Sequence, residues 1–116
     1  MGMFSGLFGS REGGAKRISP QEAHRMMEES GKHVLLDVRS ASEYRQERIK
    51  GAKSIPVDEL SRRAAAELPD KDIPIYVYCL SGARASSAAR LLANMGYSNV
   101  YNFGGIVNWP YKTVRG

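Results

Sequence analysis

The stretch IPIYVYCLSGAR, residues 73–84, decides the fold. Its first six residues are aromatic, β-branched or proline, a composition typical of a strand. This strand runs directly into Cys79 and a short segment that contains Gly82 and Arg84. From residue 85 to residue 95 apolar side chains recur with a period of about 3.6 residues, as in a helix. The sequence therefore predicts a strand, a tight loop that starts at a cysteine, and a helix.

The flanking sequence alternates in the same way between strand and helix character. Ser19 is a suitable N-cap with proline next to it, and Gly31 follows as a stop signal, so a helix is expected between them. A short helix is expected to start at Ser40 or Ser42 and to run through Tyr44. Further helices are expected at 57–66 and 85–95, and strands at 34–38, 73–78 and 99–102. A loop with a short strand is expected at 49–56, a turn at 103–105 and a helical turn at 106–109. This alternation predicts an α/β fold: a small, mostly parallel sheet flanked by helices on both faces.

Chain length and composition fit one domain. The chain has 116 residues, of which 42% are hydrophobic and 25% charged, close to the average for globular proteins. Residues 1–15 end in two glycines and are expected to form a flexible N-terminal segment, and residues 16–116 a single domain. No apolar run approaches the ~20 residues that span a bilayer, so no membrane association is expected. The small size favours a monomer.

Charge and cysteine content narrow the possible partners. The net charge is 17 − 12 = +5, which favours anions in general. No lysine- and arginine-rich block or zinc-finger spacing is present, so no nucleic-acid partner is expected. Cys79 is the only cysteine, and His24 and His33 complete no zinc-site spacing with it, so no metal or cofactor is expected. The lack of a disulfide framework and of a signal peptide predicts a cytoplasmic location.

Cys79 stands where an α/β sheet places its ligands, at the carboxyl end of a strand. The residues after it are expected to form a substrate-binding loop whose backbone N–H groups surround the sulfur: Leu80, Ser81, Gly82, Ala83 and Arg84. The start of the following helix and the charge of Arg84 both favour the thiolate over the thiol. A buried, inert cysteine is the alternative. The strand–Cys–Gly–Arg–helix arrangement favours a nucleophile.

Four fragments, taken in order along residues 16–112, resemble the signatures of the rhodanese-like sulfurtransferases. They are Asp37-Val38-Arg39 with Glu43-Tyr44, Ile49-Lys50-Gly51-Ala52 with Ile55-Pro56, the loop from Cys79 to Arg84, and Gly104-Gly105 with Trp109. The resemblance implies a small parallel sheet flanked by helices. It also implies that Cys79 carries a persulfide between two half-reactions. A sulfane sulfur would then move from thiosulfate or a persulfide donor to a thiol or cyanide.

The resemblance also suggests supporting roles. Asp37, Arg39 and Glu43 are expected to form a charge network near the loop, in which mutual structural pairing is the favoured interpretation. Arg84 is expected both to shape the loop and to pair with an incoming anion. Arg48 stands where the family usually has histidine, and we expect this change to alter substrate approach rather than abolish activity. The donor is expected to be a small anion. Because the chain has no second cysteine, the thiol acceptor must be another molecule.

Two other classes remain as alternatives. Phosphatases and arsenate reductases that resemble this fold carry a loop one residue longer between cysteine and arginine, so Cys79-x4-Arg84 disfavours them. A non-catalytic sulfur carrier or protein-interaction module of the same fold is the nearer alternative. The basic residues Arg45, Arg48, Lys50 and Lys53 could attract an anionic donor or could equally form a solvated face.

Overall fold

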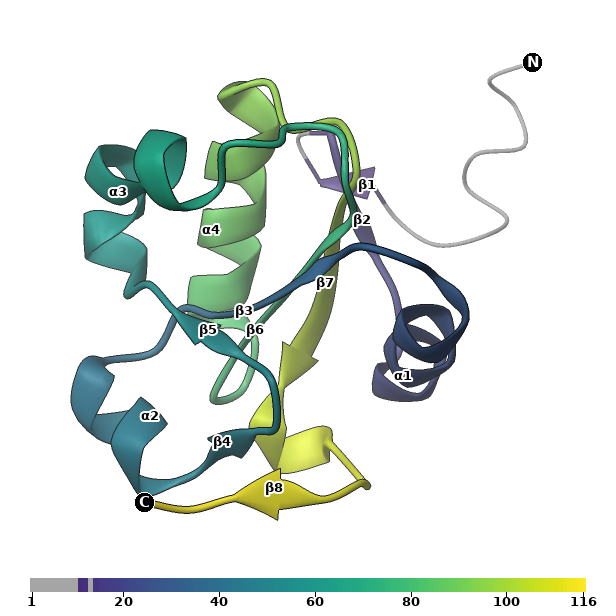
Figure 1. The fold of residues 1–116 in the computed structure, drawn as a ribbon, viewed down its shortest axis with the longest axis vertical. Helices are drawn as coiled ribbons and strands as arrows, with labels where there is room; N and C mark the ends of the chain where they lie inside the picture. The colour runs from purple at the N-terminus through teal and green to yellow at the C-terminus, as the bar shows by residue number, and fades with distance from the viewer. Residues whose placement is uncertain (1–10, 13) are drawn as a thin grey trace.

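The computed structural model describes residues 11–12 and 14–116. Its centre is a six-stranded sheet with the order β1-β2-β7-β6-β3-β5 (Figure 1). The strands are β1 (Arg11–Glu12), β2 (Ala15–Arg17), β3 (Val34–Asp37), β5 (Lys53–Ser54), β6 (Ile75–Cys79) and β7 (Val100–Gly105). Only β1 pairs antiparallel, with β2, and every other pair in this sheet is parallel. The predicted small, mostly parallel sheet is confirmed.

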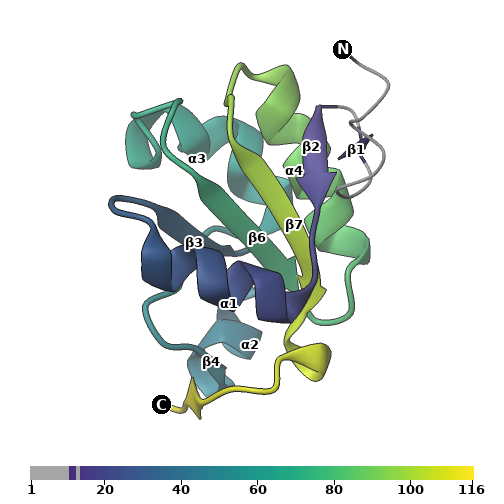
Figure 2. The same cartoon turned by 90° about the vertical axis from the view of Figure 1, so that its right-hand side faces the viewer.

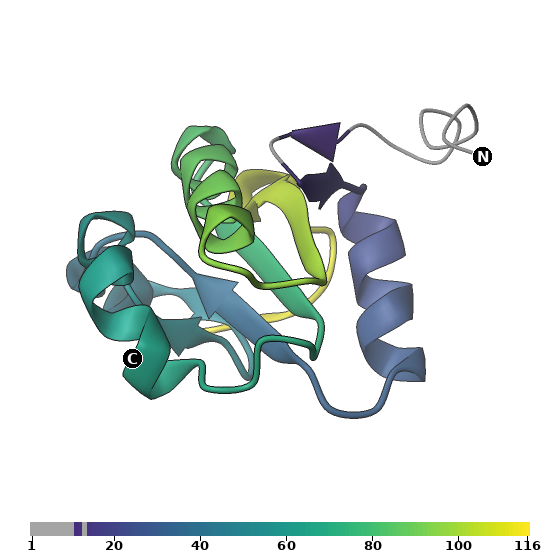
Figure 3. The same cartoon turned by 90° about the horizontal axis from the view of Figure 1, so that it is seen from above.

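Helices cover both faces of this sheet, as predicted. Helix α1 (Pro20–Glu29) lies on one face, and α3 (Leu60–Glu67) and α4 (Ala83–Asn94) lie on the other (Figures 2 and 3). The short helix α2 (Ala41–Gln46) follows β3. The described residues also form two 3-10 turns, η2 (Val57–Glu59) before α3 and η3 (Ile106–Asn108) after β7. No helix in the described part of the chain is long and apolar enough to cross a membrane.

Local capping explains where two helices begin. The Ser19 hydroxyl accepts the backbone N–H of Glu22 at 3.0 Å, and proline occupies the first turn of α1. At α2, Ser40 and Glu43 form a reciprocal capping box, each side chain accepting the backbone N–H of the other. The expected start of α1 is confirmed, and of the two expected starts of α2, Ser40 and Ser42, the structure has Ser40 as the N-cap. The capping box at α2 matters for the site, because it fixes Glu43 in the first turn of this helix.

The core has two layers, one on each face of the sheet. All five residues of β6 are buried, which explains their uninterrupted apolar character. On the α3–α4 face, Leu36 and Val77 pack with Leu92, whereas on the α1 face Tyr78 packs with Phe103. Burial on both faces holds β6 rigidly, so the residue at its carboxyl end has a fixed position.

The structure differs from the sequence-based expectations at three places. Residues 103–105, predicted as a turn, extend β7, because Gly105 has an extended backbone and pairs with Cys79 beyond a bulge in the ladder. A second, unpredicted sheet joins β4 (Arg48–Ile49) antiparallel to β8 (Thr113–Val114). Strands also begin at Arg11, before the expected start at residue 16, while residues 1–10 and 13 of the predicted flexible segment lie outside the described residues.

Candidate active site

The thiol of Cys79 lies at the carboxyl end of β6, in the middle of the sheet. The residue is only 1% exposed, and the backbone N–H of Gly82 donates to Sγ at 3.0 Å. Helix α4 begins one residue later, at Ala83. The sulfur therefore sits between the end of a buried strand and the start of a helix, as the sequence predicted.

The loop turns into α4 at Gly82, whose φ of +128° is strained for any residue with a side chain. No side chain caps the start of α4. The first backbone hydrogen bond of this helix runs from the Ser86 N–H to the Gly82 carbonyl. The N–H groups at positions 83–85 therefore have no acceptor within the helix. They and the helix dipole provide the positive surroundings that a second, anionic sulfur on Cys79 would need.

The loop rests directly on the end of β7. A Cβ atom built on Gly105 would lie 2.0 Å from the Leu80 carbonyl oxygen and 2.6 Å from the Ser81 Cα atom. The backbone N–H of Val107 donates to the same Leu80 oxygen at 3.3 Å. Glycine is therefore required at position 105 by a close backbone approach. In the sequence, Gly105 is recognisable only as part of a signature fragment and of a predicted turn.

Glu43 on α2 forms an ion pair with Arg84 in the first turn of α4. The Nη1 and Nη2 atoms of Arg84 lie 2.7 and 3.0 Å from the two carboxylate oxygens, a two-pronged ion pair between α4 and α2. The hydrogen bonds from Arg84 are the main reason that the pKa of Glu43 falls to about 2. The same bonds with Glu43 raise the pKa of Arg84. The pair is thus neutral overall, and it anchors the start of α4.

Asp37 and Arg39 form a second, separate ion pair behind the loop. Arg39 Nη2 lies 2.7 Å from Asp37 Oδ2, and both side chains are 5% exposed or less. The same Nη2 atom donates to the Glu47 carbonyl at 2.6 Å. The Tyr78 ring lies against the Arg39 guanidinium, and its hydroxyl accepts the Ile49 N–H at 3.1 Å. Burial, followed by the nearby Asp37 charge, raises the pKa of Tyr78. The expected charge network therefore consists of two pairs, one buried and one at the loop.

Comparison with known proteins agrees with this geometry. The family model for the rhodanese-like domain matches residues 19–111. The chain belongs to the rhodanese-like domain family. Thiosulfate sulfurtransferase PspE of Escherichia coli (strain K12) is 38% identical over 81 residues, which cover 70% of this chain and 78% of that protein.

A second relative and a solved structure are also similar to this chain. The putative sulfur carrier protein YrkF of Bacillus subtilis (strain 168) is 40% identical over 80 residues, but the match covers only 42% of its length, against 68% of this chain. The solution structure of the rhodanese-like domain from the Anabaena sp. Alr3790 protein superimposes with a TM-score of 0.78 at 28% identity. That match covers 86% of this chain and 79% of the other.

In this rhodanese-like domain, two of the four residues of the predicted basic segment, Arg48 and Lys53, contact groups outside the Cys79 loop. Arg48 donates to the carbonyl groups of Tyr44 and Gly116 and lies 4.8 Å from the Tyr44 ring centre, so it ties α2 to the chain end. Lys53 pairs with Glu67 at 3.3 Å. Any role of Arg48 in substrate approach stays a prediction, because its hydrogen bonds in the structure all go to backbone carbonyls.

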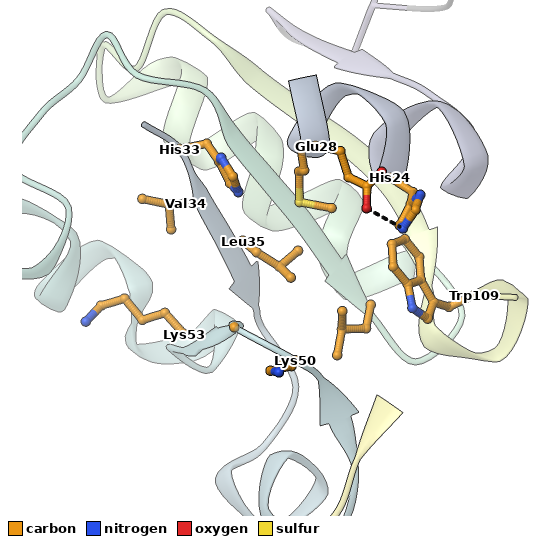
Figure 4. A pocket seen from close by; sticks show the side chains of 11 residues that line it. His24, Glu28, His33, Val34, Leu35, Lys50, Lys53 and Trp109 are labelled. Atoms are coloured by element: carbon orange, nitrogen blue, oxygen red, sulfur yellow. Dashed lines mark ion pairs between the residues drawn. The ribbon is translucent and has the colours of Figure 1, made fainter. Parts of the chain in front are cut away.

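Two cavities of the rhodanese-like domain differ in their position relative to the loop. One, of about 580 Å³, opens beside the loop, and Glu43, Leu80 and Val107 are among its lining residues. The other, of about 420 Å³, lies on the α1 face and is lined by His24, His33, Lys50 and Lys53, among others (Figure 4). Trp109 borders both. Among the described residues, no group of three or more histidine, cysteine, aspartate or glutamate side chains could hold a metal.

Proposed function

We propose that this rhodanese-like domain is a sulfurtransferase that carries a sulfane sulfur on Cys79. The observation that carries the proposal is the position of the thiol. It lies at the end of a buried strand, accepts the Gly82 N–H at 3.0 Å, and faces a helix start whose first N–H groups have no acceptor within the helix. These donors can stabilise negative charge on a sulfur bound to Cys79.

In the first half-reaction the Cys79 thiolate attacks the outer sulfur of thiosulfate. A bond forms between Sγ and that sulfur, the sulfur–sulfur bond of thiosulfate breaks, and sulfite leaves with the bonding electron pair. The new terminal sulfur carries the negative charge. A persulfide donor would react in the same way, with a thiolate as the leaving group. The loop N–H groups solvate the charge that water would otherwise have to solvate.

In the second half-reaction an acceptor nucleophile attacks the terminal sulfur. Cyanide would leave as thiocyanate and a thiolate as a persulfide, and in both cases the electrons of the broken bond return to Sγ. Because Cys79 is the only cysteine, no thiol within the chain can take the sulfur. The acceptor is therefore a separate molecule.

The two arginines have different parts in this proposal. Arg84 positions the loop through Glu43, and its charge lies close enough to the thiol that a Cys79 thiolate raises the pKa of Arg84 further. Arg39 stays with Asp37 and supports the strand ends. The loop also has one residue fewer than the phosphate-binding loops of the related phosphatases. It therefore fits a single added sulfur better than a tetrahedral phosphoryl group.

Mass spectrometry of the intact chain tests the proposal. After thiosulfate treatment we expect the mass to rise by one sulfur atom, and cyanide should remove it as thiocyanate over many cycles. Cys79→Ser should neither gain the sulfur nor turn over. Turnover in that variant would overturn the persulfide mechanism. A single loading without repeated turnover would favour a sulfur carrier, the class that the name of the Bacillus subtilis relative suggests.

A further inference from the structure

Exposed apolar side chains gather at one place on the described surface. Leu80, Val107 and Tyr111 are the three large hydrophobic residues with high exposure, at 43%, 61% and 38%. All three line the cavity of about 580 Å³ that opens beside the Cys79 loop. Single exposed apolar side chains are ordinary, but a cluster marks a surface that contacts another molecule. We call these three residues the apolar rim.

Positive charge predominates on α2, on β4 and on the segment around β8, which includes the cavity-lining Arg115. The charged groups nearest the loop are already neutralised, Glu43 by Arg84 and Asp37 by Arg39. Four basic side chains at this end form no ion pair within the described residues, and Glu47, bonded to the Thr113 hydroxyl, is the acidic group among them. The four are Arg45 on α2, Arg48 on β4, and Lys112 and Arg115 on either side of β8. The local formal charge is 4 − 1 = +3, which attracts an acidic surface over the ~8 Å range of charge at physiological salt.

We propose that the apolar rim docks a protein acceptor, one that is acidic and has apolar side chains next to its thiol. This inference rests on the proposed sulfur transfer and specifies its acceptor. Cyanide or thiosulfate needs only the N–H groups of the loop, and neither anion carries an apolar group that could pack on the apolar rim. If an apolar segment of the acceptor binds across the apolar rim, the acceptor thiol lies next to Leu80, the residue that directly follows Cys79. The acceptor thiolate would then attack the terminal sulfur, and Sγ would recover the electrons of the broken bond.

Trp109 provides a binding test that does not depend on catalysis. It is the only tryptophan in the chain, and it lines this cavity. The probes are two short synthetic peptides in which a serine is flanked by leucine and phenylalanine, one peptide rich in glutamate and the other in lysine. We expect the acidic peptide to change Trp109 fluorescence saturably and to bind at least about tenfold more tightly than the basic one. Equal affinities would overturn the proposal.

Surface variants show whether the rim is responsible. Val107→Ser removes an exposed apolar side chain, and Arg115→Glu reverses a charge in the cavity wall. Each should weaken binding of the acidic peptide about tenfold. Lys32→Glu is the matched control, because Lys32 is an exposed, unpaired lysine next to the amino end of β3, away from the loop. Equal losses in the control and in Arg115→Glu would show only a general charge effect and would refute the docking surface.

Sulfur transfer separates this inference from the proposed function. With a cysteine in place of the serine, the acidic peptide should take sulfur from thiosulfate-loaded protein. In Val107→Ser the ratio of peptide turnover to cyanide turnover should fall about tenfold. An unchanged ratio would overturn the docking surface while leaving the sulfurtransferase intact. If the unmodified chain neither loads sulfur nor turns over cyanide, the proposed function fails, and the fluorescence comparison still decides whether the rim binds the acidic peptide.

Discussion

Replacing Gly105 with alanine tests whether the end of β7 holds the Cys79 loop in place. At this position φ is −145° and ψ is 159°, which any residue can adopt, so the substitution adds no backbone strain. The new Cβ atom would lie 2.0 Å from the Leu80 oxygen and 2.4 Å from the Leu80 carbonyl carbon. Real Cβ contacts essentially never fall under 3.0 Å. The loop or the strand must therefore shift by at least 3.0 − 2.0 = 1.0 Å.

A shift of this size should reduce activity far more than stability. It would disturb the Val107–Leu80 hydrogen bond and move the Gly82 N–H away from the sulfur. A misplacement of about 1 Å costs on the order of 100-fold in rate, whereas overpacking costs about 1–3 kcal/mol of stability. We expect Gly105→Ala to lower kcat/KM for thiosulfate, measured by thiocyanate formation, about 100-fold. Urea unfolding should show a loss of about 1–3 kcal/mol.

Gly104 provides a control, because an added side chain there would strain the backbone but would not contact the loop. Gly104 has a φ of +94°, but a Cβ atom there would meet nothing within 4 Å. Gly104→Ala should therefore cost about 1–2 kcal/mol through backbone strain, without pressing on the loop. If both variants lose activity equally, or if Gly105→Ala stays within threefold of the unmodified chain, the close approach does not position the thiol.

Two further substitutions test the ion pair at the loop and the hydrogen bond behind it. The pKa of Glu43 is about 2 in the folded chain against 4.5 ordinarily, so its stabilisation is complete above pH 4.5 and is lost as the pH falls toward 2. Glu43→Gln should therefore remove about 1 kcal/mol at pH 7, after allowance for solvent screening, and reduce the steepness of acid unfolding, whereas parallel pH curves for the two proteins would contradict the pairing. Tyr78→Phe should cost about 1–3 kcal/mol, because the buried Ile49 N–H loses its acceptor. Thermal unfolding of Tyr78→Phe at the midpoint of the unmodified chain would disprove that bond.

The sequence predicted those parts of the site that are local in the chain. The strand at 75–79, Cys79 at its end and the helix after Gly82 follow from composition and periodicity alone. The partner of Arg84 could not be found this way, because Glu43 lies 41 residues earlier and only the fold brings α2 to the loop. The sequence shows that Ser40 and Glu43 have the spacing of a capping box. It does not show that this capping box holds Glu43 where it pairs with Arg84.

The other differences between the expected and the observed structure also have physical causes. Residues 103–105 contain two glycines, which favour a turn when read alone, yet Gly105 is needed because the loop backbone passes where a side chain would stand. Strands β4 and β8 have two residues each, too few to show any alternation. The sequence also does not show which residues line the cavity beside the loop. Val107 lies in the short 3-10 turn η3 and Tyr111 in the irregular segment after it, and the exposure of both side chains depends on the three-dimensional arrangement.

The pairing of β6 with β7 has a consequence for the growing chain. A protein is synthesised from its amino end, and Cys79 leaves the ribosome well before its strand partner Gly105. Strand β6 cannot pair with β7 before residues 100–105 have been synthesised, so the thiol has no support from β7 during this interval. A thiol outside its folded pocket is open to oxidation. We therefore expect the chain to be most sensitive to oxidants while it is being made, and protected once residues 100–105 have joined the sheet.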